Sequence, residues 1–333
     1  MIMSLLRNAN NAPLKKVIAF YVRFTPSYSA IGYRARSVLW GRLKPDFRGK
    51  TWLVVGGSEG IGGSAARSAV AAGARVICVG RDAGKLAAFA QSTAHPEMVV
   101  PEVADFSLRS SVWTLLDRLQ ARGVKIDVLV NNVGIQKRDQ IITREGLETS
   151  FATNILSHYL FTKEMLSRGM LADDATVIET SSGGMYNHAL AVKDLDITGS
   201  GYLGSRAYGL SKRAQVVLTQ YWRRKFAGTQ RRFYVMHPGW VDTAAISRSM
   251  PRFRETLKSV LRDDPQGADT IVYLAAKRPD QKSDESIWFD RKERTAHIFP
   301  RTRATTDTPD TLVAMLDSYC ERDAEAVATR KAA

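Results

Sequence analysis

The chain has 333 residues, of which 44% are hydrophobic and 24% charged, a balance that excludes disordered, collagen-like and small disulfide-rich proteins. The two cysteines, Cys78 and Cys320, form no C-x-x-C pair and indicate a reducing, intracellular compartment. The formal net charge is +15, and residues 1–50 contribute +9 of it, from ten Lys and Arg against the single Asp46. The chain therefore divides into a basic arm and a globular remainder.

The basic arm spans residues 1–49, and its apolar side chains Leu14, Val17, Ile18 and Tyr21 follow helical spacing. Such an amphipathic helix fits three roles: contact with an anionic membrane surface, a mitochondrial presequence, or an extension packed on the domain. A membrane span would need about 20 continuous apolar residues, which the sequence does not contain. No zinc-finger, recognition-helix or ribonucleoprotein motif accompanies the charge, so nucleic-acid binding is not expected. The expected location is cytoplasmic or membrane-associated, with the mitochondrion as an alternative.

From residue 50 onward, apolar strands alternate with helical segments, which is typical of βαβ units that build a parallel sheet. The expected strands span residues 52–55, 75–79, 98–103, 124–130, 176–179, 233–236 and 287–289. The expected helices span residues 65–72, 86–91, 110–121, 148–168, 205–226, 253–276 and 309–319. The sequence therefore predicts an α/β fold: one doubly wound Rossmann domain over residues 50–300 with a mostly parallel seven-stranded sheet, and a C-terminal helical extension over residues 301–333.

A glycine-rich turn follows the first strand and precedes the next helix. Glycines at such a turn let the backbone approach a pyrophosphate, whose charge is then placed at the helix N-terminus. An ordinary strand-to-helix turn is the alternative, but the position directly after the first strand favours nucleotide binding. The predicted contacts are Gly56, Ser58, Gly60, Ile61 and Gly62.

The second strand ends at Gly80-Arg81-Asp82, where an acid would bind an adenosine 2'-hydroxyl and an arginine would bind a 2'-phosphate. Arg81 favours NADP(H), because a guanidinium presents a planar charged fork to phosphate. Glu59 argues against it, since an acid pointing inward would repel that phosphate. Asp82 is also a candidate cap for the next helix. NADP(H) is thus the favoured cofactor, and NAD(H) is the alternative.

The spacing G-x-x-x-G-x-G over residues 56–62 resembles that of the short-chain dehydrogenase/reductase family, with Val55 in place of the family's usual threonine. Further motifs follow in the family's order: Ala104-Asp105, Asn131-Asn132-Val133-Gly134, a strand ending in Ser181-Ser182, a Tyr-x-x-x-Lys pair, and Pro238-Gly239-Trp240-Val241-Asp242-Thr243. The resemblance covers residues 50–290. It implies an oxidoreductase that interconverts a carbonyl and an alcohol by hydride transfer with a nicotinamide cofactor.

The family's Tyr-x-x-x-Lys motif occurs four times, at Tyr159/Lys163, Tyr208/Lys212, Tyr221/Lys225 and Tyr273/Lys277. The first pair precedes the serine strand, the last follows the Pro-Gly turn, and the third lies later on the same helix as the second. Tyr208 and Lys212 are therefore the predicted pair. The resemblance implies that Ser182 binds the substrate carbonyl, Tyr208 exchanges the proton and Lys212 holds the nicotinamide ribose. Asn154 resembles the family's fourth catalytic member, and a buried structural asparagine is the alternative.

The resemblance also assigns cofactor contacts. Asp105 would contact the adenine, although it could equally cap the next helix. Asn131 and Asn132 would tie strand ends together, and Gly134 would let the backbone pass beneath the adenosine ribose. The nicotinamide end would be held by Pro238, Gly239, Val241 and Thr243. No metal site is expected.

The 26 positions from Ser182 to Tyr208 exceed the family's usual spacing and predict an enlarged loop over the substrate. Apolar residues of this loop and beyond the sheet predict an apolar pocket, with ordinary packing as the alternative: Met185, Tyr186, Leu190, Leu203, Trp240 and Met250. The expected substrate is a lipid aldehyde, a retinoid or a steroid-like carbonyl. A second class of function is an NADPH-binding sensor or scaffold without turnover.

Within the family, the chain resembles one subgroup through residues 181–185, 236–243, 249–251 and 265–270 and through the basic arm. The helices that carry Asn154 and Tyr208 commonly pair subunits in this family, which implies a homodimer. A long arm that covers these helices is the alternative.

Overall fold

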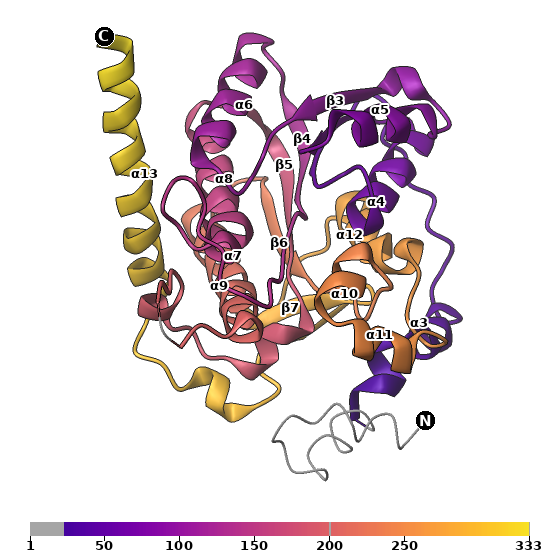
Figure 1. The fold of residues 1–333 in the computed structure, drawn as a ribbon. Helices are drawn as coiled ribbons and strands as arrows, with labels where there is room; N and C mark the ends of the chain where they lie inside the picture. Colours follow the sequence, from indigo (N-terminus) through magenta and orange to yellow (C-terminus); the bar gives the residue numbers. More distant parts are fainter. Residues whose placement is uncertain (1–22, 200, 333) are drawn as a thin grey trace.

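The computed structural model describes residues 23–199 and 201–332 and contains an eight-stranded sheet in the order β3-β2-β1-β4-β5-β6-β7-β8 (Figure 1). The strands are β1 (Thr51–Val55), β2 (Arg75–Gly80), β3 (Val99–Val103), β4 (Ile126–Asn131), β5 (Leu171–Thr180), β6 (Arg232–Met236), β7 (Ser286–Phe289) and β8 (Lys292–Thr295). Strands β1 to β7 pair in parallel, and β8 pairs antiparallel with β7. The predicted doubly wound α/β fold is confirmed.

The prediction of seven strands was wrong, because β8 was missed. This strand is a polar, largely exposed segment without the apolar pattern that identifies a strand. It joins β7 through a two-residue turn in which Asp290 and Arg291 have φ of +49° and +56°. Positive φ at both turn positions is the geometry of a type I′ hairpin, but Asp-Arg is not one of its usual sequences.

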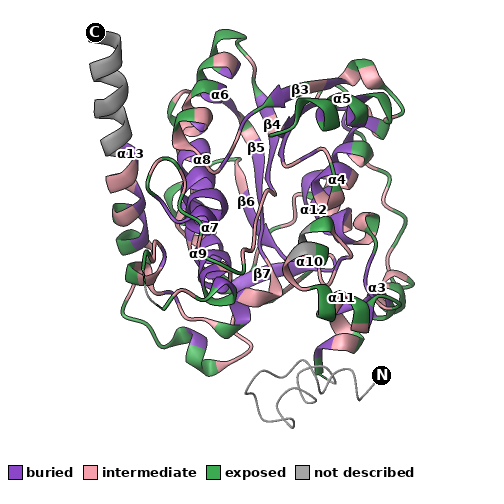
Figure 2. Ribbon diagram, in the orientation of Figure 1, coloured by how far each residue is buried: buried purple, intermediate pink, exposed green. Residues whose placement is uncertain are grey.

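Helices cover both faces of the sheet (Figure 1). On one face lie α4 (Gly60–Ala71), α5 (Ala83–Gln91) and α12 (Asp264–Lys277), packed on Trp52 and Val54 of β1. On the other lie α6 (Arg109–Ala121), α8 (Ser157–Ser167) and α9 (Gly204–Lys225), packed on Leu53 and Val55. Alternate residues of β1 thus enter opposite cores, as the two-residue period of a strand requires, and Figure 2 shows the central strands buried between the layers.

The shorter elements connect these layers. They are α7 (Thr149–Phe151), the π-helical turn η2 (Ala152–Leu156), α10 (Ala244–Ser249), α11 (Pro251–Leu257), and the 3₁₀ turns η1 (Pro96–Met98), η3 (Gly183–Asn187), η4 (Val192–Asp194) and η5 (Pro300–Arg303). The prediction of one helix over 253–276 was wrong, because the chain leaves the helix after Leu257 and restarts at α12. Asp263 caps the new helix by accepting a hydrogen bond from Gln266 N at 2.8 Å, and Pro265 fits its first turn.

The C-terminal helix α13 (Pro309–Ala332) runs along the outside of the α8–α9 layer (Figure 1). Its buried residues Leu312, Val313 and Leu316 join the core that α8 and α9 form with the sheet. Asp317 accepts hydrogen bonds from Tyr159 Oη at 2.5 Å and from Lys163 Nζ at 2.6 Å. The chain therefore covers the outer side of its own α8 and α9.

The described part of the basic arm packs on the domain. Residues 23–28 are helical, α3 (Ala30–Ser37) follows, and Phe24, Tyr28 and Ala30 are buried. The amphipathic helix predicted around residues 14–21 lies outside the described residues. Among the described helices, none combines the length and apolarity needed to cross a bilayer.

Candidate active site

The loops that carry the predicted motifs meet at the carboxyl end of the sheet. Strands β1, β4, β5 and β6 are neighbours in the sheet, and each ends at that edge. The point between β1 and β4, where the strand order reverses, is where open parallel sheets bind ligands. A cavity of about 1010 Å³ opens there. The predicted site residues that line it are Gly56, Ser58, Gly60, Ile61, Arg81, Asp105, Asn132, Gly134, Ser182, Tyr208, Lys212, Pro238, Gly239, Val241 and Thr243.

The glycine loop is shaped by backbone geometry that a side chain would disturb. Gly56 and Gly60 have φ of +75° and +60°, a region that favours glycine. A Cβ on Gly62 would lie 2.2 Å from the carbonyl oxygen of Gly56, so Gly62 lets α4 pack against the loop rather than lining the cavity. Glu59, at the N-cap of α4, makes no side-chain cap, so the first backbone N–H groups of α4 are available to a phosphate.

Charged groups surround the end of β2. The Arg81 side chain is exposed at the cavity rim. Asp82 caps α5 by accepting a hydrogen bond from Lys85 N at 2.9 Å. Glu59 forms an ion pair with Lys85 Nζ at 2.9 Å, with both side chains about half exposed. Glu59, the acid expected to repel a 2'-phosphate, is thus paired with Lys85. Arg81 lies beside the cavity.

The two asparagines at the end of β4 point in opposite directions, as successive strand residues do. Asn132 Nδ2 donates to the carbonyl oxygen of Gly56 at 3.1 Å and ties the glycine loop to β4. Asn131 is buried away from the cavity and donates to Thr162 Oγ1 at 3.0 Å. The structure therefore places Asn132 at the cavity and Asn131 in the core behind it.

Asn154 lies in the π-helical turn η2, a distortion often found near functional sites. Its Oδ1 accepts from Ile135 N at 2.8 Å, and its Nδ2 donates to Ile135 O at 2.9 Å and to Ser211 Oγ at 3.1 Å. The backbone oxygen of Asn154 accepts from Gln215 Nε2 at 2.7 Å. Asn154 therefore supports the segment after Gly134 from behind and does not line the cavity.

Ser182, Tyr208 and Lys212 come together at the cavity floor. Lys212 Nζ donates to the carbonyl oxygen of Thr180 at 2.9 Å and lies 5.6 Å from the centre of the Tyr208 ring. Burial lowers the pKa of Lys212 to about 8, opposed by the charge of Glu179. Burial raises the pKa of Tyr208, while a hydrogen bond with Ser182 acts in the opposite direction. At neutral pH, Tyr208 is therefore protonated and Lys212 is mostly charged.

This geometry agrees with comparison to known proteins. The sequence pattern of short chain dehydrogenases matches residues 50–252. The chain belongs to the short-chain dehydrogenase/reductase family. It is therefore an oxidoreductase that acts on CH–OH and C=O groups, and its fold implies a nicotinamide cofactor.

Several relatives resemble most of this short-chain dehydrogenase/reductase. Dehydrogenase/reductase SDR family member 12 from Bos taurus is 31% identical over 317 residues, which cover 93% of this chain and 99% of the relative. The resemblance to one subgroup is thereby confirmed. Retinol dehydrogenase 12 from Mus musculus is 32% identical over 267 residues, 78% of this chain and 83% of the relative. A crystal structure of an uncharacterized protein from Mycobacterium paratuberculosis has a TM-score of 0.65 and 27% identity, covering 84% of this chain and 97% of that one.

The other Tyr-x-x-x-Lys pairs of this family member lie outside the cavity. Tyr159 and Lys163 are both held by Asp317 of α13. Tyr221 Oη accepts a hydrogen bond from Lys225 Nζ at 3.1 Å on the surface. The Tyr273/Lys277 pair lies on α12, and neither residue lines the cavity.

The cavity wall differs from the predicted apolar pocket. Tyr186, Leu203, Trp240 and Met250 line the cavity, but Met185 and Leu190 are buried in the core instead. The structure adds residues that the sequence analysis missed: Phe24, Tyr28, Phe253 and Phe299. In the sequence, Phe24 and Tyr28 are four residues apart, which places them on one face of a helix. This spacing does not indicate the surface on which the two side chains pack.

Proposed function

We propose that the protein is an NADP(H)-dependent reductase of apolar carbonyls in which Ser182, Tyr208 and Lys212 are the catalytic residues. The observation that carries the proposal is the arrangement at the cavity floor. Ser182, Tyr208 and Lys212 line one cavity, and the Lys212 ammonium lies 5.6 Å from the centre of the Tyr208 ring. The same cavity contains the glycine loop and Arg81.

The residues around the cavity fit NADP(H). The N-terminus of α4 offers free backbone N–H groups to a pyrophosphate, and the positive φ of Gly60 brings the backbone to the cavity surface. Arg81 offers its guanidinium to a 2'-phosphate. Because Lys85 neutralises Glu59, the acid in the loop does not oppose that phosphate. These features favour NADP(H) over NAD(H).

The chain's residues would then divide the work of carbonyl reduction. The cofactor supplies the hydride when bound. Ser182 and Tyr208 donate hydrogen bonds to the carbonyl oxygen and stabilise its developing negative charge. Tyr208 passes its proton to that oxygen, and the positive Lys212 stabilises the resulting tyrosinate until solvent protonates it again. A tyrosine whose pKa is raised holds its proton at neutral pH, which suits reduction.

The residues of the cavity wall support an apolar substrate. Tyr186, Trp240, Met250 and Phe253 line the same cavity as Ser182, and aromatic and methionine side chains suit apolar ligands. Relatives named as retinol dehydrogenases support this class. Lipid aldehydes, retinoids and steroid-like ketones fit it.

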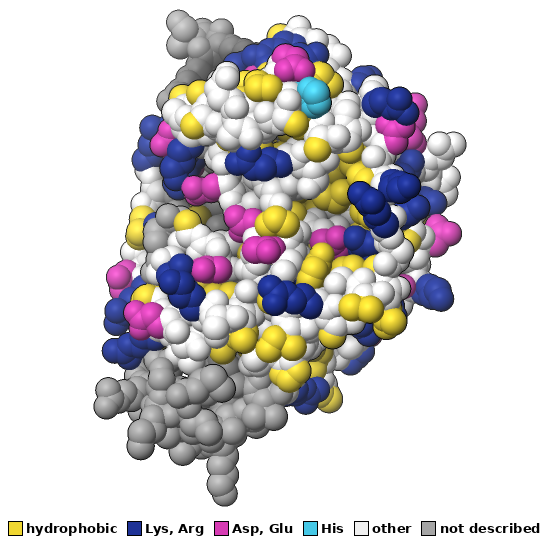
Figure 3. Space-filling view, turned by 90° about the vertical axis from the view of Figure 1, so that its right-hand side faces the viewer, with side chains coloured by type: hydrophobic (Ala, Val, Ile, Leu, Met, Phe, Trp, Pro, Cys, Tyr) yellow, Lys and Arg dark blue, Asp and Glu magenta, His cyan; other side chains and the backbone are white. Residues whose placement is uncertain are grey.

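The arm also supports association with an anionic membrane surface. Val38 and Leu39, which follow α3, are 84% and 83% exposed, and Arg42 and Lys44 follow them. On the face shown in Figure 3, basic and acidic side chains are mixed. The protein should sediment with vesicles that contain phosphatidylserine at low salt. Less of the Val38→Asp/Leu39→Asp variant should sediment with these vesicles. Equal sedimentation of both proteins would refute a role for these two residues.

The decisive test is NADPH oxidation with a panel of long-chain aldehydes, retinoids, steroids and aryl ketones. Tyr208→Phe should reduce kcat by at least about 100-fold, the usual contribution of a positioned proton donor, while the Kd for NADPH stays unchanged. Tyr221→Phe, the same substitution in a surface Tyr-x-x-x-Lys pair, is the matched control and should keep full activity. Tight NADPH binding without turnover of any carbonyl would instead support the sensor or scaffold function.

A further inference from the structure

We infer that the N-terminal arm completes the substrate pocket: Tyr28, fixed by the buried Arg36–Asp290–Arg262 network, forms the wall beside Ser182 and limits the size of the group attached to the carbonyl carbon. The inference rests on the proposed carbonyl reductase function and assigns a specificity-determining residue to it. Tyr28, Arg36, Arg262 and Asp290 all lie outside residues 50–252, which match the family pattern.

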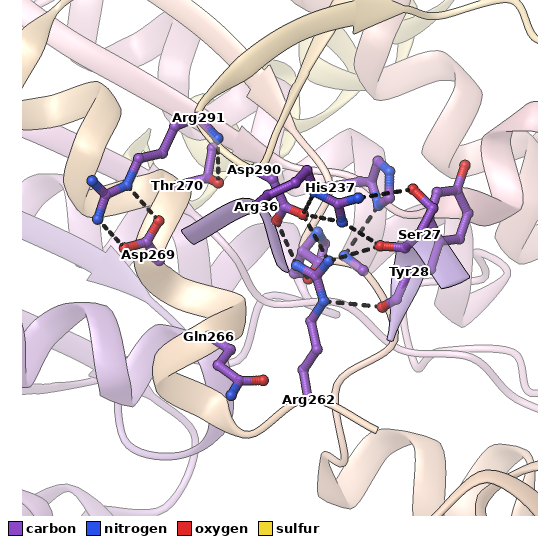
Figure 4. Close-up of polar contacts among 12 residues, drawn as sticks. Ser27, Tyr28, Arg36, His237, Arg262, Gln266, Asp269, Thr270, Asp290 and Arg291 are labelled. Carbon is purple, nitrogen blue, oxygen red and sulfur yellow. Dashed lines mark hydrogen bonds and ion pairs between the residues drawn. The ribbon is translucent and has the colours of Figure 1, made fainter. Parts of the chain in front are cut away.

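The arm is held by a buried charge network (Figure 4). Asp290 accepts hydrogen bonds from Arg262 Nη1 at 2.6 Å, Arg262 Nη2 at 2.9 Å and Arg36 Nε at 2.7 Å. The side chains of Arg262 and Asp290 are each 1% exposed, and that of Arg36 is 24% exposed. Both arginines also donate to the carbonyl oxygen of Ser27, Arg262 at 3.2 Å. One carboxylate thus joins α3, the segment before α12 and the β7–β8 turn.

The backbone of the arm is bonded directly to the Pro-Gly turn after β6. The carbonyl oxygen of Tyr28 accepts from Trp240 N at 2.9 Å and from Arg262 Nε at 3.0 Å. Arg262 Nη1 donates to Pro238 O at 3.0 Å. Gly239 has φ of +80°, and a Cβ there would lie 2.7 Å from Tyr28 O and 2.5 Å from Arg262 Nε. These contacts fix the arm against the turn at residues 238–240, which is predicted to hold the nicotinamide.

This anchoring brings the Tyr28 ring to the catalytic serine. A Cβ on Gly183, the residue after Ser182, would lie 3.4 Å from Tyr28 Cε2. The ring is also packed by His237 at 4.8 Å, Phe289 at 5.3 Å and Trp240 at 5.8 Å between ring centres. Tyr28 and Phe24 both line the cavity.

The Tyr28 ring cannot yield easily to a larger substrate. It is 7% exposed and has aromatic neighbours on several sides. Burial and a hydrogen bond with Tyr186 raise the pKa of its hydroxyl, which therefore stays neutral. Close-packed interiors resist displacement of large side chains. A neutral, immobile ring beside Ser182 limits the size of the group that the carbonyl carbon can carry on that side.

The test compares acetophenone and butyrophenone, which share a phenyl group and differ by two methylenes on the other side of the carbonyl. Tyr28→Ala should raise the ratio of kcat/KM for butyrophenone over acetophenone by roughly tenfold or more, because one methylene in a fitted pocket changes specificity by about 10- to 200-fold. Tyr33→Ala is the matched control. Tyr33 is an aromatic residue of the same arm that packs on Trp40 and Arg262 and does not line the cavity. A merely structural role for Tyr28 would lower both activities in both variants and leave the ratio unchanged.

A second measurement separates failure of this inference from failure of the proposed function. Calorimetry gives the Kd of each ketone for the NADP⁺-bound protein, with Tyr28→Leu as a bulkier variant should Tyr28→Ala fail to fold. A shift in the Kd ratio toward butyrophenone in the Tyr28 variants but not in Tyr33→Ala supports the wall, even if no ketone is reduced. An unchanged ratio overturns the wall. Absence of turnover in the wild-type protein overturns the reductase function alone.

Discussion

Replacing Asp290 by asparagine tests the network that holds the arm. The substitution removes one charge and little volume, and asparagine tolerates the positive φ of +49° at this position. It leaves Arg262, which is 1% exposed, facing Arg36 without a counter-charge. Breaking a buried ion pair costs about 3–5 kcal/mol. Because the asparagine oxygen still accepts one hydrogen bond, we expect a loss near the lower end, about 3 kcal/mol.

Urea unfolding followed by far-UV circular dichroism measures this loss as a lower midpoint at a similar slope. The matched control is Asp46→Asn, which removes an ion pair with Arg48 whose side chains are 82% and 56% exposed. The midpoint of the control should stay at the wild-type value, since exposed pairs add little. If Asp290→Asn unfolds at the same urea concentration as Asp46→Asn, the network does not stabilise the folded chain and the reasoning is refuted.

Three other predictions follow from the site and the outer helix. The kcat for carbonyl reduction should fall as pH rises through about 8, because Lys212 loses the charge that stabilises the tyrosinate. The charge of Glu179 raises the pKa of Lys212, so Glu179→Gln should move this fall to lower pH. A flat profile from pH 6 to 10 would contradict this prediction. Asp264 faces Gly60, and burial together with neighbouring acids raises its pKa. Asp264→Asn should therefore tighten NADPH binding roughly fivefold, the scale of about 1 kcal/mol for one removed like-charge repulsion, and an unchanged Kd by calorimetry would count against it. Since α13 covers α8 and α9, sedimentation of the wild-type protein should give the mass of one chain. If the wild-type protein is instead a dimer, and Leu316→Glu in the buried face of α13 is a dimer as well, the subunits pair through another surface.

Local patterns predicted the sheet and the residues at its edge. Alternation of apolar strands with helices predicted strands β1 to β7 along the chain. Motifs placed directly after parallel strands had to meet at one edge, as Gly56, Ser182 and Gly239 do. Predictions failed where long-range packing decides the outcome. The opposite directions of Asn131 and Asn132 depend on the register of β4, and β8 depends on an unusual turn.

The contribution of the arm to the cavity was not predictable from local sequence. Arg36 and Asp290 are separated by 254 positions, and charge pairing at such a distance leaves no periodic signal. The basic composition of residues 1–50 left targeting, membrane contact and packing on the domain open, and two of these arginines, Arg36 and Arg48, form ion pairs within the fold. Composition alone does not separate a charge that binds a partner from one that binds its own chain.

The separation between Arg36 and Asp290 also orders events during synthesis. A ribosome that adds about 5–20 residues per second makes Asp290 on the order of 10–50 s after Arg36. Until the chain has passed residue 299, Tyr28 and Phe24 in turn lack their later-made neighbours Phe289 and Phe299. A chain that stops before residue 290 can form the early strands but cannot close its pocket. The Tyr28 wall of the pocket is therefore fixed in place later than the catalytic residues Ser182, Tyr208 and Lys212 are made.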